Sequence, residues 1–178
     1  MWDFSVVVAR EDMGGMIKKT KSLRLNKLIS LLFWVVIFES IGYLLGLLTQ
    51  ANIHPWYEEL NKSFLTPPGI VFSVVWTMLY ALLAVIAWIL SSNNKFYSKK
   101  IVLLFALQML MNWACTPLFF ALQWITLSSI WLVSLTCLNA ILIFAVSKTH
   151  KTLAWLLSPY LFWLVFASYL NVFIALMN

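Results

Sequence analysis

Side chains able to perform conventional catalysis are scarce in this chain of 178 residues. Two cysteines, Cys115 and Cys137, lie inside long apolar runs, and two histidines, His54 and His150, are separated by several such runs. Isolated thiols and imidazoles do not make a metal site. The sequence also has no GxSxG, HExxH or glycine-rich phosphate motif. Conventional nucleophilic, metal and nucleotide chemistry is therefore not expected.

Aromatic and amide side chains are instead the residues whose spacing suggests a site. Phe72, Trp76 and Tyr80 recur every four residues, which places them along one face of a helix. Aromatic rings around a few amides suit a flat, apolar ligand with limited polar groups. Two further helical faces carry such residues: Gln108, Asn112, Cys115 and Phe119 on one, and Trp163, Phe166, Ala167, Leu170 and Asn171 on the other. The alternative is that the amides only join helices, with no cavity between them.

Composition indicates which elements must position these residues. Hydrophobic residues make up 63% of the chain, charged residues make up 10%, and the mean hydropathy is +0.91. Soluble domains contain about 45–50% apolar and about 25% charged residues, so a soluble globule and a disordered chain are both excluded. The net charge of +6 does not indicate nucleic-acid binding, because the basic residues lie at the ends of long neutral runs.

Charge-free runs give the number of membrane spans. The 47-residue run between Lys100 and Lys148 would form a helix of about 70 Å, more than twice the hydrocarbon thickness of a bilayer. This run must therefore fold back once, around Gln123–Ser128. The other apolar runs hold one span each. The sequence predicts an all-α bundle of five transmembrane helices, at about residues 28–48, 69–90, 100–122, 126–147 and 152–177.

Lysine and arginine positions orient the bundle. All basic residues except Lys62 fall in the N-terminal arm (1–26 and Lys27) or in the loops after the second and fourth helices, which hold Lys95, Lys99, Lys100, Lys148 and Lys151. Five spans place these three segments on one side. The positive-inside rule puts that side and the N-terminus in the cytoplasm, with the C-terminus outside. A bacterial inner membrane is the expected location, and the mitochondrial outer membrane is the alternative.

The chain begins with an N-terminal arm, residues 1–26. We assign no function to its first 15 residues. Met16 is an alternative start, because the sequence from there reads as an ordinary basic lead-in to a first helix. That helix is too long for the apolar core of a cleaved signal peptide.

The first predicted span contains two polar or small-residue features. Glu39 is the only formal charge within a span, and an intramembrane carboxylate is a candidate functional residue. The alternative is a protonated Glu39 that is hydrogen-bonded to a neighbouring helix. Gly42 and Gly46 form a GxxxG pair, which allows close helix contact with or without dimerisation.

Residues 49–68 are predicted to form an ordered lid. Trp56 and Tyr57 precede a charged turn, and two prolines, Pro67 and Pro68, fix the start of the next helix. Lys62 in this loop either contacts an anionic ligand or is a solvated charge. Five other tryptophans are expected at the membrane–water interface: Trp34, Trp88, Trp124, Trp131 and Trp155.

Three spaced motifs resemble the TspO/translocator protein family, also called tryptophan-rich sensory proteins or peripheral benzodiazepine receptors. The resemblance covers residues 27–178, and the motifs follow one another in the family's order. They are Trp56-Tyr57-x-x-Leu60-x-Lys62 with Pro67-Pro68, Phe72, Trp76 and Tyr80; Asn112-Trp113 through Pro117-x-Phe119-Phe120; and Pro159-Tyr160-x-x-Trp163-x-x-Phe166-Ala167-x-x-Leu170-Asn171.

The resemblance implies a five-helix bundle in the lipid bilayer, often a homodimer, with a pocket closed by the first loop. Family members bind porphyrins and haem-related tetrapyrroles, and synthetic isoquinoline-carboxamide and benzodiazepine ligands. Two positions, Trp76 and Trp163, also match tryptophans implicated in porphyrin breakdown by some bacterial relatives. Carried over by position, the pocket would include Tyr57, Trp76, Gln108, Asn112, Cys137, Trp163 and Ala167.

Two stretches depart from the family pattern. Ser63 replaces the proline that usually follows the loop lysine, so a less rigid loop is expected. The stretch Val172–Leu176 lacks the tyrosine and basic residue of the animal cholesterol motif. Cholesterol recognition through that segment is therefore not expected.

Three functions remain open at this point. The first is a membrane receptor, sensor or transporter that binds tetrapyrroles and needs no resident cofactor or metal. The second is an enzyme that degrades porphyrin with light and oxygen, in which Trp76 and Trp163 exchange electrons with the excited ring. The third is a membrane scaffold that needs no ligand.

Overall fold

The computed structural model describes residues 4–92 and 96–178, with side chains from Leu25 onward. Lys95 and the side chains of the basic arm before Leu25 lie outside this description. The described chain is helical and contains no strand, which confirms the predicted all-α class. Its helices are α1 (Phe4–Ala51), α2 (Gly69–Ser92), α3 (Lys99–Thr116), α4 (Ile125–Ser147) and α5 (Lys151–Met177), with two short π-helical segments, η1 (Ile53–Tyr57) and η2 (Pro117–Ala121).

Five helical segments in the described residues are long and apolar enough to cross a membrane, as the charge-free runs predict. They have 23 to 27 residues each, which corresponds to about 35–40 Å and exceeds the hydrocarbon thickness slightly. Helix α1 continues as one helix well before the predicted start at residue 28. The membrane-crossing segments are Leu25–Ala51, Gly69–Ser92, Lys99–Ala121, Ile125–Ser147 and Lys151–Met177.

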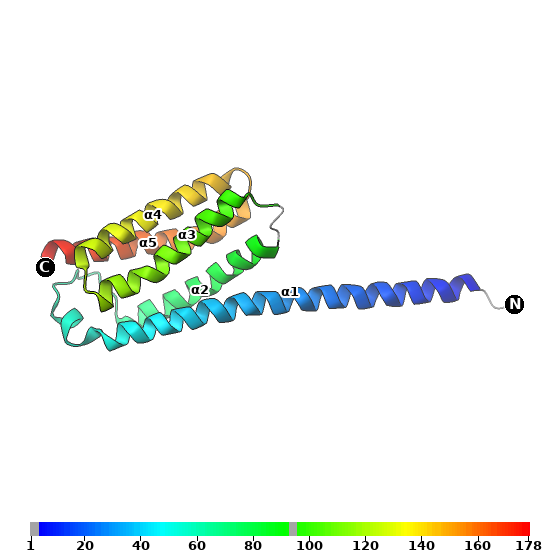
Figure 1. Cartoon of the computed structure of the whole chain (residues 1–178), viewed down its shortest axis with the longest axis horizontal. Helices are drawn as coiled ribbons and strands as arrows, with labels where there is room; N and C mark the ends of the chain where they lie inside the picture. Colours follow the sequence, from blue (N-terminus) through cyan, green and yellow to red (C-terminus); the bar gives the residue numbers. More distant parts are fainter. Residues whose placement is uncertain (1–3, 93–95) are drawn as a thin grey trace.

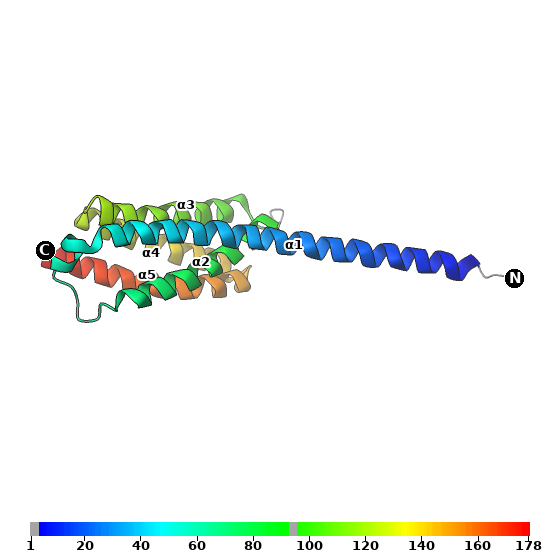
Figure 2. The same ribbon diagram turned by 90° about the horizontal axis from the view of Figure 1, so that it is seen from below.

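The helices form a closed ring in the order α1, α2, α5, α4, α3. Helices α4 and α5 make the most extensive contact, while the α2–α5 and α1–α3 seams are the least closely packed. Figures 1 and 2 show the two chain termini at opposite ends of the molecule, as an odd number of spans requires. In both views the N-terminal part of α1 runs past the other four helices.

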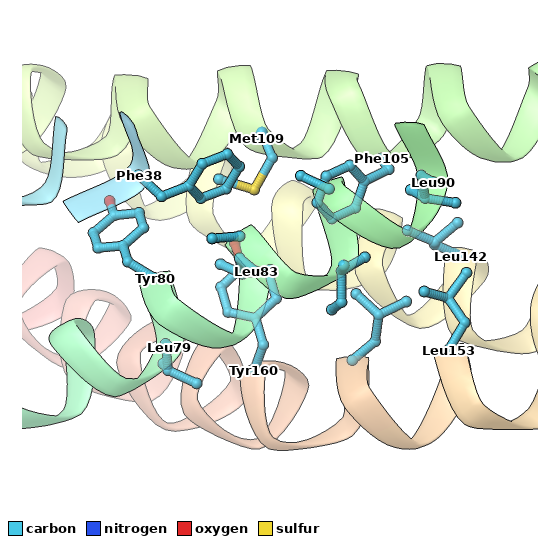
Figure 3. Packing of buried hydrophobic residues seen from close by; sticks show 14 of the residues in the cluster. Phe38, Leu79, Tyr80, Leu83, Leu90, Phe105, Met109, Leu142, Leu153 and Tyr160 are labelled. Atoms are coloured by element: carbon cyan, nitrogen blue, oxygen red, sulfur yellow. The ribbon is translucent and has the colours of Figure 1, made fainter. Parts of the chain in front are cut away.

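The core is a column of aliphatic and aromatic side chains from all five helices. Leu83, Leu135 and Leu164 are fully buried, and Figure 3 shows Phe38, Tyr80, Met109 and Tyr160 converging from four helices. Large apolar side chains also cover the outside of every helix, such as Phe144 and Phe162. Helices that are apolar on all sides are typical of membrane spans.

The predicted reversal in the 47-residue apolar run occurs between η2 and α4. Gln123 has a φ of 56°, in the left-handed region where the chain can turn sharply. Helix α4 begins immediately afterwards at Ile125. At the opposite end of the bundle, the Ser98 side chain accepts a hydrogen bond from the Ile101 amide and caps α3.

Candidate functional site

Five of the aromatic residues predicted for the site come together where α2 meets α5. The Trp76 and Trp163 rings lie 6.4 Å apart and are nearly perpendicular, at 89°. Trp76 also contacts Tyr80 with ring centroids 5.5 Å apart. Trp163 contacts Phe72 and Phe166, each at a centroid distance of 5.6 Å. We call these residues, Phe72, Trp76, Tyr80, Trp163 and Phe166, the α2–α5 aromatic cluster.

A groove of about 400 Å³ runs along this seam. Its walls are almost wholly apolar, and Met78 and Phe162 at its rim are 67% and 77% exposed, so it opens on the outer surface of the bundle. The Nε1 atom of Trp163 is buried and has no hydrogen-bond partner. The groove is lined by Val75, Met78, Leu79 and Leu82 of α2 and Pro159, Phe162, Trp163 and Phe166 of α5.

The aromatic residues of the predicted lid form a second, separate group. Trp56 and Tyr57 of η1 pack on Phe119, at centroid distances of 5.4 and 6.1 Å, and Tyr57 also contacts Phe120 at 5.4 Å. The structure therefore brings Trp56 and Tyr57 onto Phe119 of η2. Within the described residues, no ring contact joins this group to the α2–α5 aromatic cluster. Burial raises the pKa of the Tyr57 phenol, so it is neutral at physiological pH.

The amides of α3 face inward but are hydrogen-bonded to other helices. Asn112 accepts a hydrogen bond from the Tyr80 hydroxyl at 3.0 Å and donates one to the Tyr160 hydroxyl oxygen at 2.9 Å. It thereby joins α2, α3 and α5. Gln108 accepts a hydrogen bond from Asn139 of α4 at 2.6 Å. These contacts match the alternative in which the amides join helices, although Tyr80 also belongs to the aromatic cluster.

The Gln108–Asn139 pair is only half satisfied. Both residues are fully buried, and Gln108 Nε2 and Asn139 Oδ1 have no hydrogen-bond partner. Neither Asn139 nor Tyr160 is among the site residues predicted from the sequence, although Tyr160 is part of the third motif. The signal for Asn139 was available, because a lone amide in an apolar span is as costly facing lipid as Gln108 is.

The remaining predicted site residues are distributed unevenly. Cys115 is half-buried and its thiol donates to the Met111 carbonyl at 3.3 Å. Ala167 is partly buried against the core. Cys137 is exposed on α4, so the structure does not bring it together with the other candidates.

Three residues fasten the loop to itself and to the C-terminal end of α5. Lys62 donates hydrogen bonds to the carbonyls of Tyr57, Glu58 and Leu60, at 2.7–2.9 Å. The buried Ser63 hydroxyl is 2.9 Å from the Tyr169 hydroxyl. Asn61 bonds through its backbone amide to the Asn178 side chain at 2.9 Å. The serine that replaces the family's proline thus tethers the loop to α5, whereas the sequence predicted a looser loop.

Glu39 and Gly42 lie one helical turn apart on α1. Glu39 is partly buried and its Oε1 atom has no hydrogen-bond partner, so the expected bond to a neighbouring helix is not formed through this atom. Gly42 packs against the Tyr80 ring, while Gly46 has open space around its Cα atom. Only the first glycine of the GxxxG pair therefore supports a close contact within the chain.

Two of the tryptophans expected at the interface also have partners within the bundle. Trp34 Nε1 donates to the Ser91 hydroxyl at 3.0 Å, and Trp131 Nε1 donates to the Met111 carbonyl at 2.9 Å. Trp124 and Trp155 are more than half exposed, as an interfacial position requires. Within the described side chains, no group of three His, Cys, Asp or Glu residues is placed to hold a metal ion.

Comparison with known proteins gives one consistent result. Residues 31–177 match the TspO/MBR family. The tryptophan-rich protein TspO of Archaeoglobus fulgidus is 32% identical over 78% of this chain and 90% of its own. The translocator protein of Bos taurus is 30% identical over 73% of this chain and 79% of its own. The tryptophan-rich sensory protein of Cereibacter sphaeroides is 29% identical over 69% and 78%.

The match covers the first span from residue 31, the other four spans in full, both aromatic groups and the loop that joins α1 to α2. The order of the three motifs and the arrangement of the helices agree with it. This multi-pass membrane protein belongs to the TspO/MBR family.

Proposed function

We propose that the protein binds a porphyrin or haem-like tetrapyrrole at the α2–α5 aromatic cluster and acts as a membrane receptor, sensor or transporter for it. The observation that carries this proposal is the perpendicular Trp76–Trp163 pair beside an apolar groove, with an indole N–H that has no partner in the protein. A flat macrocycle offers faces for stacking and a few polar atoms at its edge.

The size and lining of the groove support this ligand class. Small-molecule sites are typically about 300–1,000 Å³, apolar, and furnished with a few placed polar groups. The groove of about 400 Å³ lies within that range. Trp163 and Phe166 of the cluster line the groove, and aromatic side chains favour contact with the ring system of a ligand. The Trp163 N–H, which is buried and has no partner, would satisfy one acceptor on a ligand that inserts far enough to reach it.

The names of two relatives suggest the physiological role. Relatives are called translocator protein and tryptophan-rich sensory protein. We carry translocation and sensing over to this chain as part of the proposal. The setting is a bacterial inner membrane with the N-terminus in the cytoplasm, as the charge pattern predicts, and a homodimer, as the family resemblance implies.

Titration of the purified protein in nanodiscs with protoporphyrin IX tests the proposal. Trp163→Phe keeps a ring but removes the N–H, and we expect about five-fold weaker binding, the value of about one hydrogen bond. Trp163→Leu also removes the aromatic contact, and we expect a loss of about thirty-fold. Trp124→Leu is the matched control, because Trp124 is 52% exposed and outside the cluster. Equal affinity in all four proteins would refute the site.

One observation favours a second candidate, light- and oxygen-dependent degradation of the bound porphyrin. Trp76, Tyr80 and Trp163 form a contiguous set of oxidisable rings, next to which an excited macrocycle could lose or gain an electron, with molecular oxygen as the final oxidant. Incubation with protoporphyrin IX and oxygen, in light and in darkness, separates the two functions. A new absorbing product that requires both light and Trp163 supports the enzyme; unchanged porphyrin supports a binding protein.

A further inference from the structure

The end of the bundle where α5 begins is basic and lacks counter-charge. Lys27, Lys99, Lys100, Lys148 and Lys151 are all exposed there. The carboxylates among the described side chains lie elsewhere: Glu39 is within a span, and Glu58 and Glu59 follow η1 at the opposite end. In the part of the chain that the structure describes, the one contact between a carboxylate and a basic side chain within 4 Å is His54–Glu58, at that opposite end. This basic surface therefore has no neutralising partner among the described residues.

A groove of about 250 Å³ lies at this basic end, where α4 ends and α5 starts. It is lined by Ser147, Lys151, Ala154, Trp155 and Ser158. Lys151 and Trp155 are one turn apart on the same face of α5, and Trp155 is 77% exposed. The groove therefore joins an ammonium group at the mouth to an apolar wall within the membrane-spanning segment.

The two serine hydroxyls in the groove already donate their hydrogen atoms to carbonyls of the protein. Ser147 donates its hydroxyl hydrogen to the Phe144 carbonyl at 2.9 Å, and Ser158 donates to the Ala154 carbonyl at 2.8 Å. Their oxygens remain able to accept a hydrogen bond. The groove thus offers a cation, two hydroxyl acceptors and an apolar indole wall.

We propose that this groove binds an anionic phospholipid, with its phosphate on Lys151 and its acyl chain along Trp155. A phosphatidylglycerol head group supplies the negative charge for the ammonium and hydroxyl donors for the serine oxygens. A zwitterionic lipid would bring its own cation toward Lys151. Basic pockets between spans on the cytoplasmic side are typical sites for acidic head groups, and the positive-inside rule assigns this end to the cytoplasm.

A lipid fits the groove better than a free anion does. The apolar walls formed by Ala154 and Trp155 make no hydrogen bond to a hydrated phosphate. They would instead bury the first methylene groups of an acyl chain. This inference uses a different groove, different residues and a different ligand from the tetrapyrrole proposal. Either can therefore fail without the other.

Native mass spectrometry of the detergent-solubilised full chain tests the site. The probes are 1-palmitoyl-2-oleoyl phosphatidylglycerol and the corresponding phosphatidylcholine. Lys151→Gln removes the groove ammonium, and we expect its affinity for phosphatidylglycerol to fall about five-fold. Lys148→Gln removes an equal charge from the same end outside the groove, and we expect less than a two-fold change. Lys151→Arg should retain binding.

Three outcomes would overturn the proposal. Equal losses in Lys151→Gln and Lys148→Gln would mean diffuse surface attraction. Equal retention of phosphatidylcholine and phosphatidylglycerol by the wild type would mean that charge is not recognised. Displacement of the lipid by millimolar glycerol phosphate would mean a site for free anions. Thermal unfolding of each variant in the same detergent checks that a lost adduct does not reflect a lost fold.

Discussion

Gly42 of α1 faces the ring of Tyr80 of α2 so closely that a Cβ atom at position 42 would lie 2.6 Å from Tyr80 Cδ2. Gly42→Ala must therefore displace Tyr80, which also holds Asn112 and stacks on Trp76. We expect a decrease of about 1–3 kcal/mol in the free energy of unfolding, measured by denaturation in mild detergent.

Gly46→Ala is the control for this substitution. A Cβ atom at position 46 meets nothing within 4 Å, and alanine is a better helix former than glycine by about 0.5–1 kcal/mol. We expect Gly46→Ala to be neutral or stabilising within the monomer. Equal destabilisation by both substitutions would contradict the close approach at Gly42 and would point to a contact outside the chain.

Asn112 is expected to be the strongest single polar contributor to the bundle. Asn112→Leu leaves the hydroxyls of Tyr80 and Tyr160 without their partner, and we expect a loss of about 1–2 kcal/mol in the free energy of unfolding. A double-mutant cycle with Tyr80→Phe should give a coupling energy of at least about 0.5 kcal/mol. Strict additivity of the two substitutions would refute the hydrogen bond between them.

The Ser63–Tyr169 contact should control how often the loop opens. Tyr169→Phe removes one hydroxyl from the pair, and we expect hydrogen exchange in residues 58–66 to accelerate about five-fold. Mass spectrometry of the corresponding peptide measures this rate. Tyr43→Phe removes the hydroxyl of a 68% exposed tyrosine of α1 and should leave the rate unchanged. Similar rates in wild type and Tyr169→Phe would show that the contact does not hold the loop.

Glu39 should be dispensable for stability. Because its buried Oε1 atom has no hydrogen-bond partner in the chain, Glu39→Gln is expected to change the free energy of unfolding by less than about 1 kcal/mol, or to raise it. Thermal unfolding in nanodiscs provides the measurement. A larger loss would mean that the carboxylate contacts a ligand or a second copy, and that it has been retained for that reason.

The span pattern was predictable because charge in a membrane is so costly that it confines lysine to helix ends. The inward face of α3 was also predictable, because exposing the amides of Gln108 and Asn112 to lipid costs free energy. The path of residues 49–68 was not. The path of this loop depends on contacts such as Ser63–Tyr169, between positions 106 residues apart. That path places Trp56 against Phe119 and not against Trp76.

Helix α4 shows how little an apolar sequence says about the rotation of a helix about its axis. Cys137 and Asn139 lie two residues apart, which turns them to different faces of the helix. The structure exposes the first and buries the second. The amide of Asn139 indicates that rotation, because it is costly facing lipid. The apolar residues around it add little, because they lie on every side of the helix and their periodicity carries little information.

The sideways mouth of the groove between α2 and α5 has a practical consequence. With Met78 and Phe162 at its rim, the groove would admit a hydrophobic ligand from among the acyl chains, after that ligand has dissolved in the bilayer. Occupancy of the groove would then depend on the ligand's mole fraction in the lipid phase. Dissociation constants expressed per litre of buffer will shift with the amount of lipid or detergent in the sample, so variants should be compared at a constant lipid-to-protein ratio.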